Sequence, residues 1–303
     1  MDAKEIAKRV QIASALEVSG YPKPGNVHRT RNFDDMAFED FIISGVVIGN
    51  TVEEAALQAK SIDDLKDAEL GRFISEAVSE TDKWIANNTN LGIVMMSVPI
   101  AAAAAISDSF EEIRANVEAL MDATTVEDAC NLYDAIGLAA AGGMGDQDEY
   151  DVTNESAKDE LRANNQTMYD VLKISAPWDR LASELTSGMP VVFEIGCPAF
   201  LKFKEEYGND VDCINKATVL LFLTLLSKVP DTLISRKYGD EVAEEVSKKA
   251  EAVLKAKDSE DFDKILADFD DELYQSKYNP GTTADLTEAS IFLSYLYEGF
   301  AED

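Results

Sequence analysis

Apolar residues recur at helical spacing near the start of the chain. Ile6, Val10 and Ala13 are three or four positions apart, which places them on one face of a helix, and Asp2–Glu5 has the pattern of a capping box. Farther on, two mostly apolar runs over 91–106 and 217–229 are longer than a typical strand. We therefore predict an N-terminal amphipathic helix and two buried helices.

The rest of the chain is also mostly helical in pattern. Helical periodicity predicts further helices over 35–50, 62–86, 242–255 and 286–300, with helix starts at 109–112 and 125–128. Within 62–86, the predicted inward residues are Leu70, Phe73, Ala77 and Trp84. Only 191–195 is typical of a strand, and one strand makes no sheet. No repeat or flexible linker divides the chain, so we predict one all-α domain over 1–303, a multi-helix bundle with functional loops at helix ends.

The charge of the chain limits its partners. Asp and Glu number 58 against 27 Lys and Arg, which gives a formal net charge of −31. A surface of this kind repels DNA, RNA and acidic membranes, so we predict no nucleic-acid partner. The acidity is equally consistent with adaptation to high salt and with plain solubility.

Location and metal chemistry are limited by other features. The first residues are charged and contain no apolar signal segment, and no apolar run reaches the roughly 20 residues of a membrane span. We predict a cytoplasmic protein without a membrane partner, with Cys130, Cys197 and Cys213 reduced. His28 is the only histidine, which excludes a multi-histidine metal site and any Ser-His-Asp triad that uses another histidine.

The first candidate binding segment is a basic loop in this acidic chain. The sequence 22–29 contains Lys23, His28 and Arg29, together with two prolines and Gly25. Prolines and glycine restrict the backbone shape, and a rigid cationic loop suits phosphate binding. The alternative is a charged turn between two helices, in which His28 has only a structural role.

Glu17 is an isolated acidic residue on the apolar face formed by Ile6, Val10 and Ala13. A carboxylate on a buried face needs a partner or a function, and it could bind a cation or act as a base. The alternative is that Glu17 lies at the helix end and reaches solvent.

Two Asn- and Gly-rich segments lie between predicted helices. Asn88, Thr89 and Asn90 come just before the apolar helix at 91–106, where they can cap the helix or present its N–H groups to an anion. The segment 142–145 has the sequence GGMG and is followed by Asp151. No GK[ST] follows it, so it is not a Walker A loop.

Two later segments combine acidic, basic and hydroxyl groups. Asp231 lies close to Arg236 and Lys237. The segment 279–286 contains Gly281, Thr282, Thr283 and Asp285. The hydroxyls of Thr282 and Thr283 and the carboxylate of Asp285 can cap a helix, or they can hold Mg²⁺ or a ribose.

Five ordered motifs now resemble one family. PKPGNVHR, NTNLGI, GGMG with a following DV, PDTLISRKYG and NPGTTADL occur in this order, and the chain from about residue 10 to 297 is similar to the triphosphoribosyl-dephospho-CoA synthase family. The resemblance implies a helical enzyme that moves the triphosphoribosyl group of ATP to the 2′-hydroxyl of 3′-dephospho-CoA. Adenine is released, and the product is the prosthetic-group precursor of acyl carrier proteins. Mg²⁺ dependence is also implied.

The resemblance also assigns roles to the candidate residues. Breaking the ribose–adenine bond builds positive charge on the ribose, and a base must take the acceptor proton. The predicted catalytic carboxylates are Glu17, Asp231 and Asp285, with their individual roles open, and the predicted metal ligands are Asp231 and Asp285. The predicted nucleotide- and phosphate-binding residues are Lys23, Gly25, Asn26, His28, Arg29, Asn88, Thr89, Asn90, Arg236, Lys237, Gly281, Thr282 and Thr283.

Two positions depart from the family pattern. Gly137 stands where the family often has Arg, and Ala141 stands where Pro is common. An alternative is therefore a related ATP-dependent ribosyl transferase with another acceptor, and a second alternative is a nucleotide-binding helical protein without turnover. The expected small-molecule partners are ATP and dephospho-CoA, and a homodimer is left open.

Overall fold

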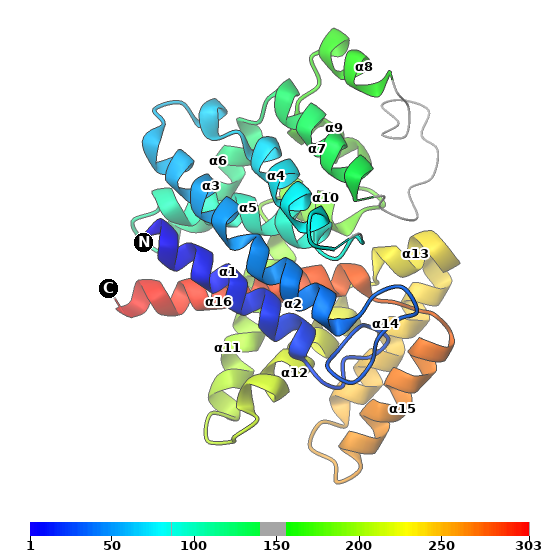
Figure 1. Ribbon diagram of the computed structural model, residues 1–303. Coiled ribbons are helices and arrows are strands. Elements are labelled where there is room, and N and C mark those ends of the chain that lie inside the picture. Colours follow the sequence, from blue (N-terminus) through cyan, green and yellow to red (C-terminus); the bar gives the residue numbers. More distant parts are fainter. Residues whose placement is uncertain (86, 140–155, 303) are drawn as a thin grey trace. The chain divides into compact units, whose positions relative to one another are not determined.

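The computed structural model describes residues 1–85, 87–139 and 156–302, whose regular elements are helical (Figure 1). No strand occurs among these residues, although His28 and Arg31 form an isolated bridge. The predicted all-α class is confirmed. The chain divides into two compact units, each discontinuous in sequence. The first unit comprises 1–12, 43–190 and 295–303, and the second comprises 13–42 and 191–294.

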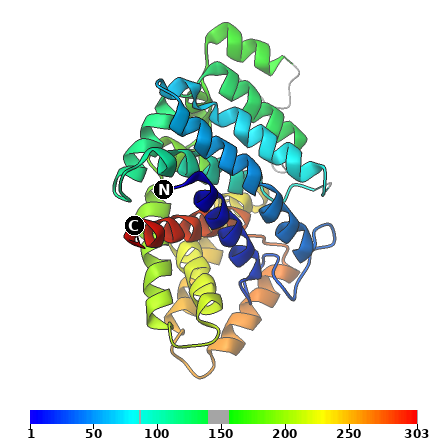
Figure 2. The same cartoon turned by 60° about the vertical axis from the view of Figure 1, so that its left-hand side comes forward.

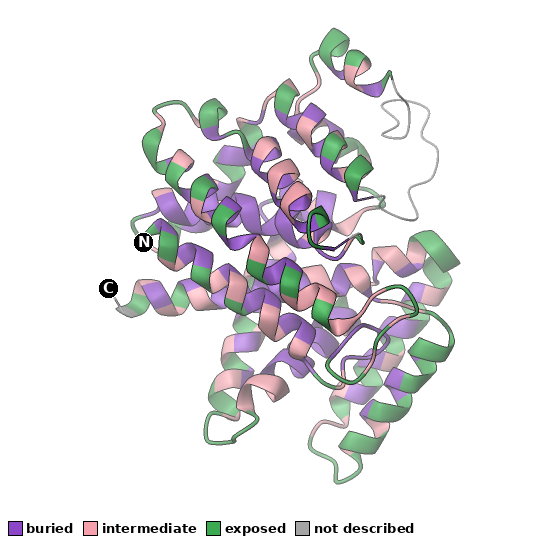
Figure 3. Cartoon of the chain, in the orientation of Figure 1, coloured by how far each residue is buried: buried purple, intermediate pink, exposed green. Residues whose placement is uncertain are grey.

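The first unit is built around α5 (Leu91–Ile106), which is buried along nearly its whole length (Figure 3). It packs against α3 (Gly49–Ser61), α4 (Leu70–Asp82) and α6 (Glu112–Asp122). The remaining helices of this unit are α7 (Val126–Leu138), α8 (Ala157–Asn164), α9 (Met168–Ser175) and α10 (Arg180–Thr186), with a short 3₁₀ turn at Leu65–Ala68. The predicted buried helix at 91–106 is confirmed, and its apolar composition explains why other helices surround it.

The second unit is built around α12 (Cys213–Lys228), whose central residues are all buried. It packs against α11 (Cys197–Glu206) and α14 (Asp240–Lys255). The unit also contains α13 (Thr232–Tyr238) and α15 (Phe262–Gln275). In Figures 1 and 2, α14 and α15 lie side by side, and Figure 2 shows them from a second direction.

Three helices contribute residues to both units. They are α1 (Ala3–Ser19), α2 (Phe38–Val47) and α16 (Gly281–Glu302). The C-terminal part of α1, from Ala13, and the first part of α16, to Ser294, belong to the second unit. The Ser14 hydroxyl of α1 donates to Glu288 Oε1 of α16 at 3.2 Å, so these two parts are in direct contact within that unit.

Several sequence-based boundaries are wrong for local reasons. The predicted strand at 191–195 is a π-helical turn, Val192–Gly196, that continues into α11. Among the described residues there is no second strand with which it could form backbone bonds. The predicted helix over 62–86 is shorter, since Glu69 has a left-handed φ of 52° and α4 starts only after it. Trp84 follows the end of α4 and is 66 % exposed instead of inward.

Other local predictions are confirmed. Leu70, Phe73 and Ala77 are buried on α4, and Thr125 forms a capping box with Asp128 at the start of α7. Among the described helices, none alone has the length and apolarity to cross a membrane, and α12 with α13, bent by 53°, passes that test as a pair by length and composition.

Candidate functional site

Most of the predicted site residues lie in the second unit. They come from the end of α1, the loop that follows it, the two ends of α13 and the start of α16. Asn88, Thr89 and Asn90 lie in the first unit. Ala141, the GGMG segment at 142–145 and Asp151 lie outside the described residues.

Glu17 and Lys23 form a buried ion pair. Glu17 is 2 % exposed and Lys23 is fully buried. The Lys23 Nζ atom contacts Glu17 Oε1 and also donates to the Glu17 backbone carbonyl at 3.1 Å. Glu17 therefore does not reach solvent, and Lys23 is its partner. The Lys23 ammonium also lies 5.9 Å from the centre of the Phe222 ring.

Burial moves both groups of this pair toward their neutral forms. The loss of hydration raises the pKa of Glu17, and the nearby Lys23 charge opposes that shift. The same loss of hydration lowers the pKa of Lys23, opposed by the charges of Glu17 and Asp285. The pair is thus held in an environment that penalises charge on each partner.

Asp285 lies close enough for its charge to act on Lys23. It is half-buried and stands one turn into α16 rather than at the helix start. One turn farther along α16, Glu288 is fully buried and accepts the hydrogen bond from Ser14. Sequence analysis missed Glu288. The available signal was its position three residues after Asp285, which puts both carboxylates on one face of α16, as Ser14 and Glu17 are on α1.

Asp231 joins the starts of two helices. Its Oδ1 accepts from the backbone N–H groups of Leu233 and Ile234 at 2.9 and 3.1 Å. Its Oδ2 accepts from the N–H and hydroxyl of Thr283 at 2.7 and 2.8 Å. A negative charge at two helix N-termini is favourable, and this carboxylate serves both α13 and α16.

The environment of Asp231 has opposing effects on its protonation. Burial raises the pKa of Asp231, and its hydrogen bonds from Thr283, Ile234 and Leu233 oppose that rise. Beside it, the Thr232 and Thr282 hydroxyls lie 3.1 Å apart. A Cβ on Gly281 would stand 2.7 Å from Leu233 Cδ2, so Gly281 permits the close approach of α16 to α13.

The basic loop after α1 is held against α15 and α16. Gly25 has a φ of +71°, which favours glycine. The Asn26 side chain donates to Asn279 Oδ1 at 2.7 Å. His28 is buried, and its Nε2 lies 3.1 Å from Asp270 Oδ2. Sequence analysis missed Asp270, whose position on the apolar face of α15 was the available signal.

The exposed cations of this region are Arg29, Arg236 and Lys237. The Arg29 guanidinium contacts the side chain of Asn215 and lies 5.5 Å from the centre of the Tyr21 ring. Arg236 and Lys237 lie in the last turn of α13. The buried Asp231 carboxylate thus lies at the start of α13, and the two exposed cations lie at its end.

The polar segment before α5 combines capping with one unsatisfied group. Asn88 Oδ1 accepts from the Leu91 N–H at 3.2 Å, and Asn90 Nδ2 donates to Thr81 Oγ1 at 2.8 Å. Thr89 is 6 % exposed, and its buried hydroxyl has no hydrogen-bond partner in the described part of the chain. The predicted capping function is confirmed for Asn88.

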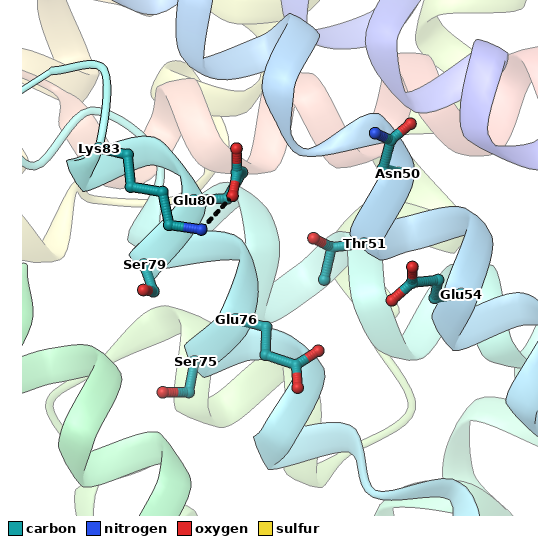
Figure 4. Close-up of a pocket in the computed structure, with 8 residues that line it drawn as sticks. All are labelled: Asn50, Thr51, Glu54, Ser75, Glu76, Ser79, Glu80 and Lys83. Carbon is teal, nitrogen blue, oxygen red and sulfur yellow. Dashed lines mark hydrogen bonds and ion pairs between the residues drawn. The ribbon is translucent and has the colours of Figure 1, made fainter.

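A polar cavity of about 500 Å³ lies in the first unit between α3 and α4 (Figure 4). None of the predicted site residues lines it. Its walls carry carboxylates, hydroxyls, one amide and the Lys83 ammonium, which pairs with Glu80 at 2.6 Å. The lining residues are Asn50, Thr51, Glu54, Ser75, Glu76, Ser79, Glu80 and Lys83.

In the second unit, buried and half-buried carboxylates therefore lie near a buried lysine, with exposed cations on adjacent segments. Carboxylates can act as general acids or bases and exposed cations can bind phosphate, and an enzyme that transfers a group from a phosphorylated substrate requires groups of both kinds.

Comparisons with known proteins agree with that class. Residues 3–303 match the family model of ATP:dephospho-CoA triphosphoribosyl transferases. The fold is similar to the crystal structure of an Archaeoglobus fulgidus protein assigned as a triphosphoribosyl-dephospho-CoA synthase. Its TM-score is 0.63 at 25 % identity, over 82 % of this chain and 97 % of that chain. Among curated proteins, none matches this sequence.

The chain belongs to the ATP:dephospho-CoA triphosphoribosyl transferase family. It is a transferase of the pentosyl class, and the substrates of the family are ATP and dephospho-CoA. The family resemblance of the sequence motifs is thus confirmed.

Proposed function

We propose that Asp285 takes the proton from the acceptor hydroxyl during triphosphoribosyl transfer. The supporting observation is the different exposure of the three predicted carboxylates. Glu17 is buried against Lys23, and Asp231 accepts four hydrogen bonds. Asp285 alone among these three is half-buried rather than buried, so substrate can reach it.

In the proposed reaction, the acceptor oxygen forms a bond to the ribose carbon of ATP as that carbon loses adenine. The hydroxyl proton passes to Asp285, and adenine leaves with the bonding electron pair and takes a proton from water. Asp285 then gives its proton to the hydroxide that remains, which restores the carboxylate and the water. Positive charge builds on the ribose as the bond to adenine breaks. In this proposal the Asp285 carboxylate, before it takes the proton, also stabilises that cation.

Lys23 then has an indirect function in the proposal. With no exposed surface, it does not touch the triphosphate, and it acts through Glu17 and Asp285. Arg29, Arg236 and Lys237 are exposed, and we assign triphosphate binding to them because guanidinium and ammonium groups form strong hydrogen bonds to phosphate.

The predicted Mg²⁺ is proposed to enter with ATP. The described residues hold no group of three His, Cys, Asp or Glu side chains that could bind a metal ion. Asp231 is unsuited as a ligand because both oxygens already accept two hydrogen bonds each. Mg²⁺ commonly keeps waters and binds substrate phosphates, and it would there neutralise part of the triphosphate charge.

Asn88, Thr89 and Asn90 form a separate polar element in the first unit. We propose that it binds a phosphate or ribose group, supported by the buried Thr89 hydroxyl without a partner. The cytoplasm is the proposed location, because ATP is available there and none of the three cysteines, all of them described, is in a disulfide. The homodimer stays a prediction.

The test is adenine release. The protein is incubated with ATP, Mg²⁺ and dephospho-CoA, and adenine is measured by chromatography. Asp285→Asn is expected to lower kcat by about 10²- to 10⁴-fold, with little change in KM for ATP. The control is Asp240→Asn, an exposed residue at the start of α14. An Asp285→Asn enzyme with wild-type kcat would refute the assignment.

A related transferase with another acceptor is the second candidate, suggested by Gly137. This glycine is exposed on α7, and no atom of the described residues lies within 4 Å of the place of a Cβ. Gly137→Arg therefore restores the side chain common in the family without a clash. If the position contacts the acceptor, KM for dephospho-CoA falls in the variant. An unchanged KM for dephospho-CoA would show that residue 137 lies on the surface of α7 without contacting the acceptor.

A further inference from the structure

Asp270 is a buried acidic residue on the apolar face of α15. Its neighbours on that face are Leu266, Phe269 and Leu273, which are also buried. A carboxylate in such a position costs free energy unless it is hydrogen-bonded or paired. Its partners therefore indicate why this position is acidic.

All the partners that Asp270 has among the described residues lie in the basic loop. Asp270 Oδ1 accepts from the Gly25 N–H at 3.0 Å. Its Oδ2 lies 3.1 Å from His28 Nε2 and 3.0 Å from Arg31 Nη1. One carboxylate thus contacts three residues spread over seven positions of the loop.

The hydrogen bonds of His28 determine its tautomer. The Thr30 N–H points at His28 Nδ1 at 3.4 Å, and the Thr30 hydroxyl lies 3.3 Å from the same nitrogen. We assign Nδ1 as an acceptor because the backbone N–H can only donate. The ring hydrogen is then on Nε2, from which it is donated to Asp270. The neighbouring Arg31 also pairs with Asp271 and lies 4.7 Å from the centre of the Tyr274 ring.

The backbone at Gly25 is pressed against the same helix. A Cβ there would lie 2.6 Å from Leu273 Cβ and 2.5 Å from the Tyr278 carbonyl oxygen. The loop between Gly25 and Arg31 is consequently fixed at one end by close packing and along its length by Asp270. This places Asn26 on Asn279 and leaves Arg29 exposed.

We propose that Asp270 is the positioning residue of the basic loop. It does not touch substrate. It sets the orientation of Asn26, His28 and Arg29 by accepting hydrogen bonds from Gly25 and His28 and by forming an ion pair with Arg31. This inference rests on the proposed function insofar as the loop binds the triphosphate of ATP. Its physical content, a carboxylate that fixes the tautomer of His28, is independent of the reaction.

The first test uses the fact that His28 is the only histidine of the chain. The ¹⁵N NMR spectrum of the imidazole therefore reports on one residue. In the wild type, the nitrogen shifts are expected to show hydrogen on Nε2. A wild-type spectrum with hydrogen on Nδ1 overturns the proposal, whatever the enzyme activity and whether or not any variant folds.

The second test is Asp270→Asn, which keeps the shape and removes the charge. An amide in this position can accept from Gly25 or donate to His28, but it gives no ion pair to Arg31. We expect the His28 tautomer to change and KM for ATP to rise about 10- to 100-fold, with kcat altered far less. Asp270→Glu, which restores the charge, is expected to recover part of the loss in KM.

The matched control is Asp263→Asn, an exposed residue on the same helix. It is expected to leave KM and the His28 spectrum unchanged. If Asp270→Asn retains both the wild-type tautomer and the wild-type KM, the positioning function is wrong. If the wild type releases no adenine, the proposed function fails, and the NMR comparison still decides whether Asp270 orients His28.

Discussion

The Lys23 ammonium is paired with the Glu17 carboxylate where neither side chain has appreciable contact with water. The two residues are only six positions apart, at the end of α1 and in the loop that follows. Breaking such a pair from one side leaves a charge that is neither hydrated nor paired. The pair therefore links the stability of the second unit to the chemistry proposed for Asp285.

Removal of one partner is expected to be more damaging than removal of both. Lys23→Met should lower the free energy of unfolding by about 3–5 kcal/mol, because it leaves Glu17 without its partner. The double variant Glu17→Gln with Lys23→Met should recover a large part of that loss. Urea denaturation measures both values, and a double variant less stable than Lys23→Met would contradict the buried-pair interpretation.

The same pair predicts a pH dependence of stability. Burial raises the pKa of Glu17 from 4.5 in the folded protein, so the folded state holds this proton more tightly than the unfolded chain. That contribution to stability is full below pH 4.5 and is lost as the pH rises through the folded pKa. The wild type should thus lose stability relative to Glu17→Gln on going upward from pH 4.5, as urea titrations at a series of pH values would show. A difference that is constant across this range would contradict the direction of the shift.

Asp231 is expected to affect folding more than turnover. Asp231→Ala removes the cap of α13 and both bonds to Thr283, and should cost about 2 kcal/mol or more in unfolding free energy. The kcat of the folded fraction should remain within a few-fold of the wild type. Asp240→Ala, an exposed residue on the neighbouring helix, serves as the control. A large drop in kcat with unchanged stability would instead make Asp231 a catalytic residue.

A comparison of Gly25, in the basic loop, with Gly239, after α13, distinguishes the cost of backbone strain from the cost of a steric clash. Gly25 and Gly239 have φ values of +71° and +94°. Of the two, only Gly25 has close neighbours, since no atom in the described part of the chain lies within 4 Å of a Cβ at Gly239. Gly239→Ala should cost about 1 kcal/mol from strain alone. Gly25→Ala should cost more in thermal unfolding and should raise KM for ATP. Equal losses in the two variants would show that the loop has room to move away from Leu273.

The fold class and the family could be predicted from the sequence alone. Helical periodicity is local, and the apolar runs at 91–106 and 217–229 exceed what a strand accommodates, so the all-α prediction needed no tertiary information. The capping box at Thr125 is equally local. The ordered motifs from 22–29 to 279–286 carry the family in the same way.

The interior positions of the polar groups were decided only by the tertiary structure. No spacing along the chain shows that Lys23 is buried against Glu17, or that Asp231 on α13 also caps α16. The chain contains 58 acidic residues, and nothing in the sequence distinguished Asp270 and Glu288 as buried ones. Burial, pairing and pKa depend on which helices pack together, and that choice follows from contacts between residues far apart in the chain.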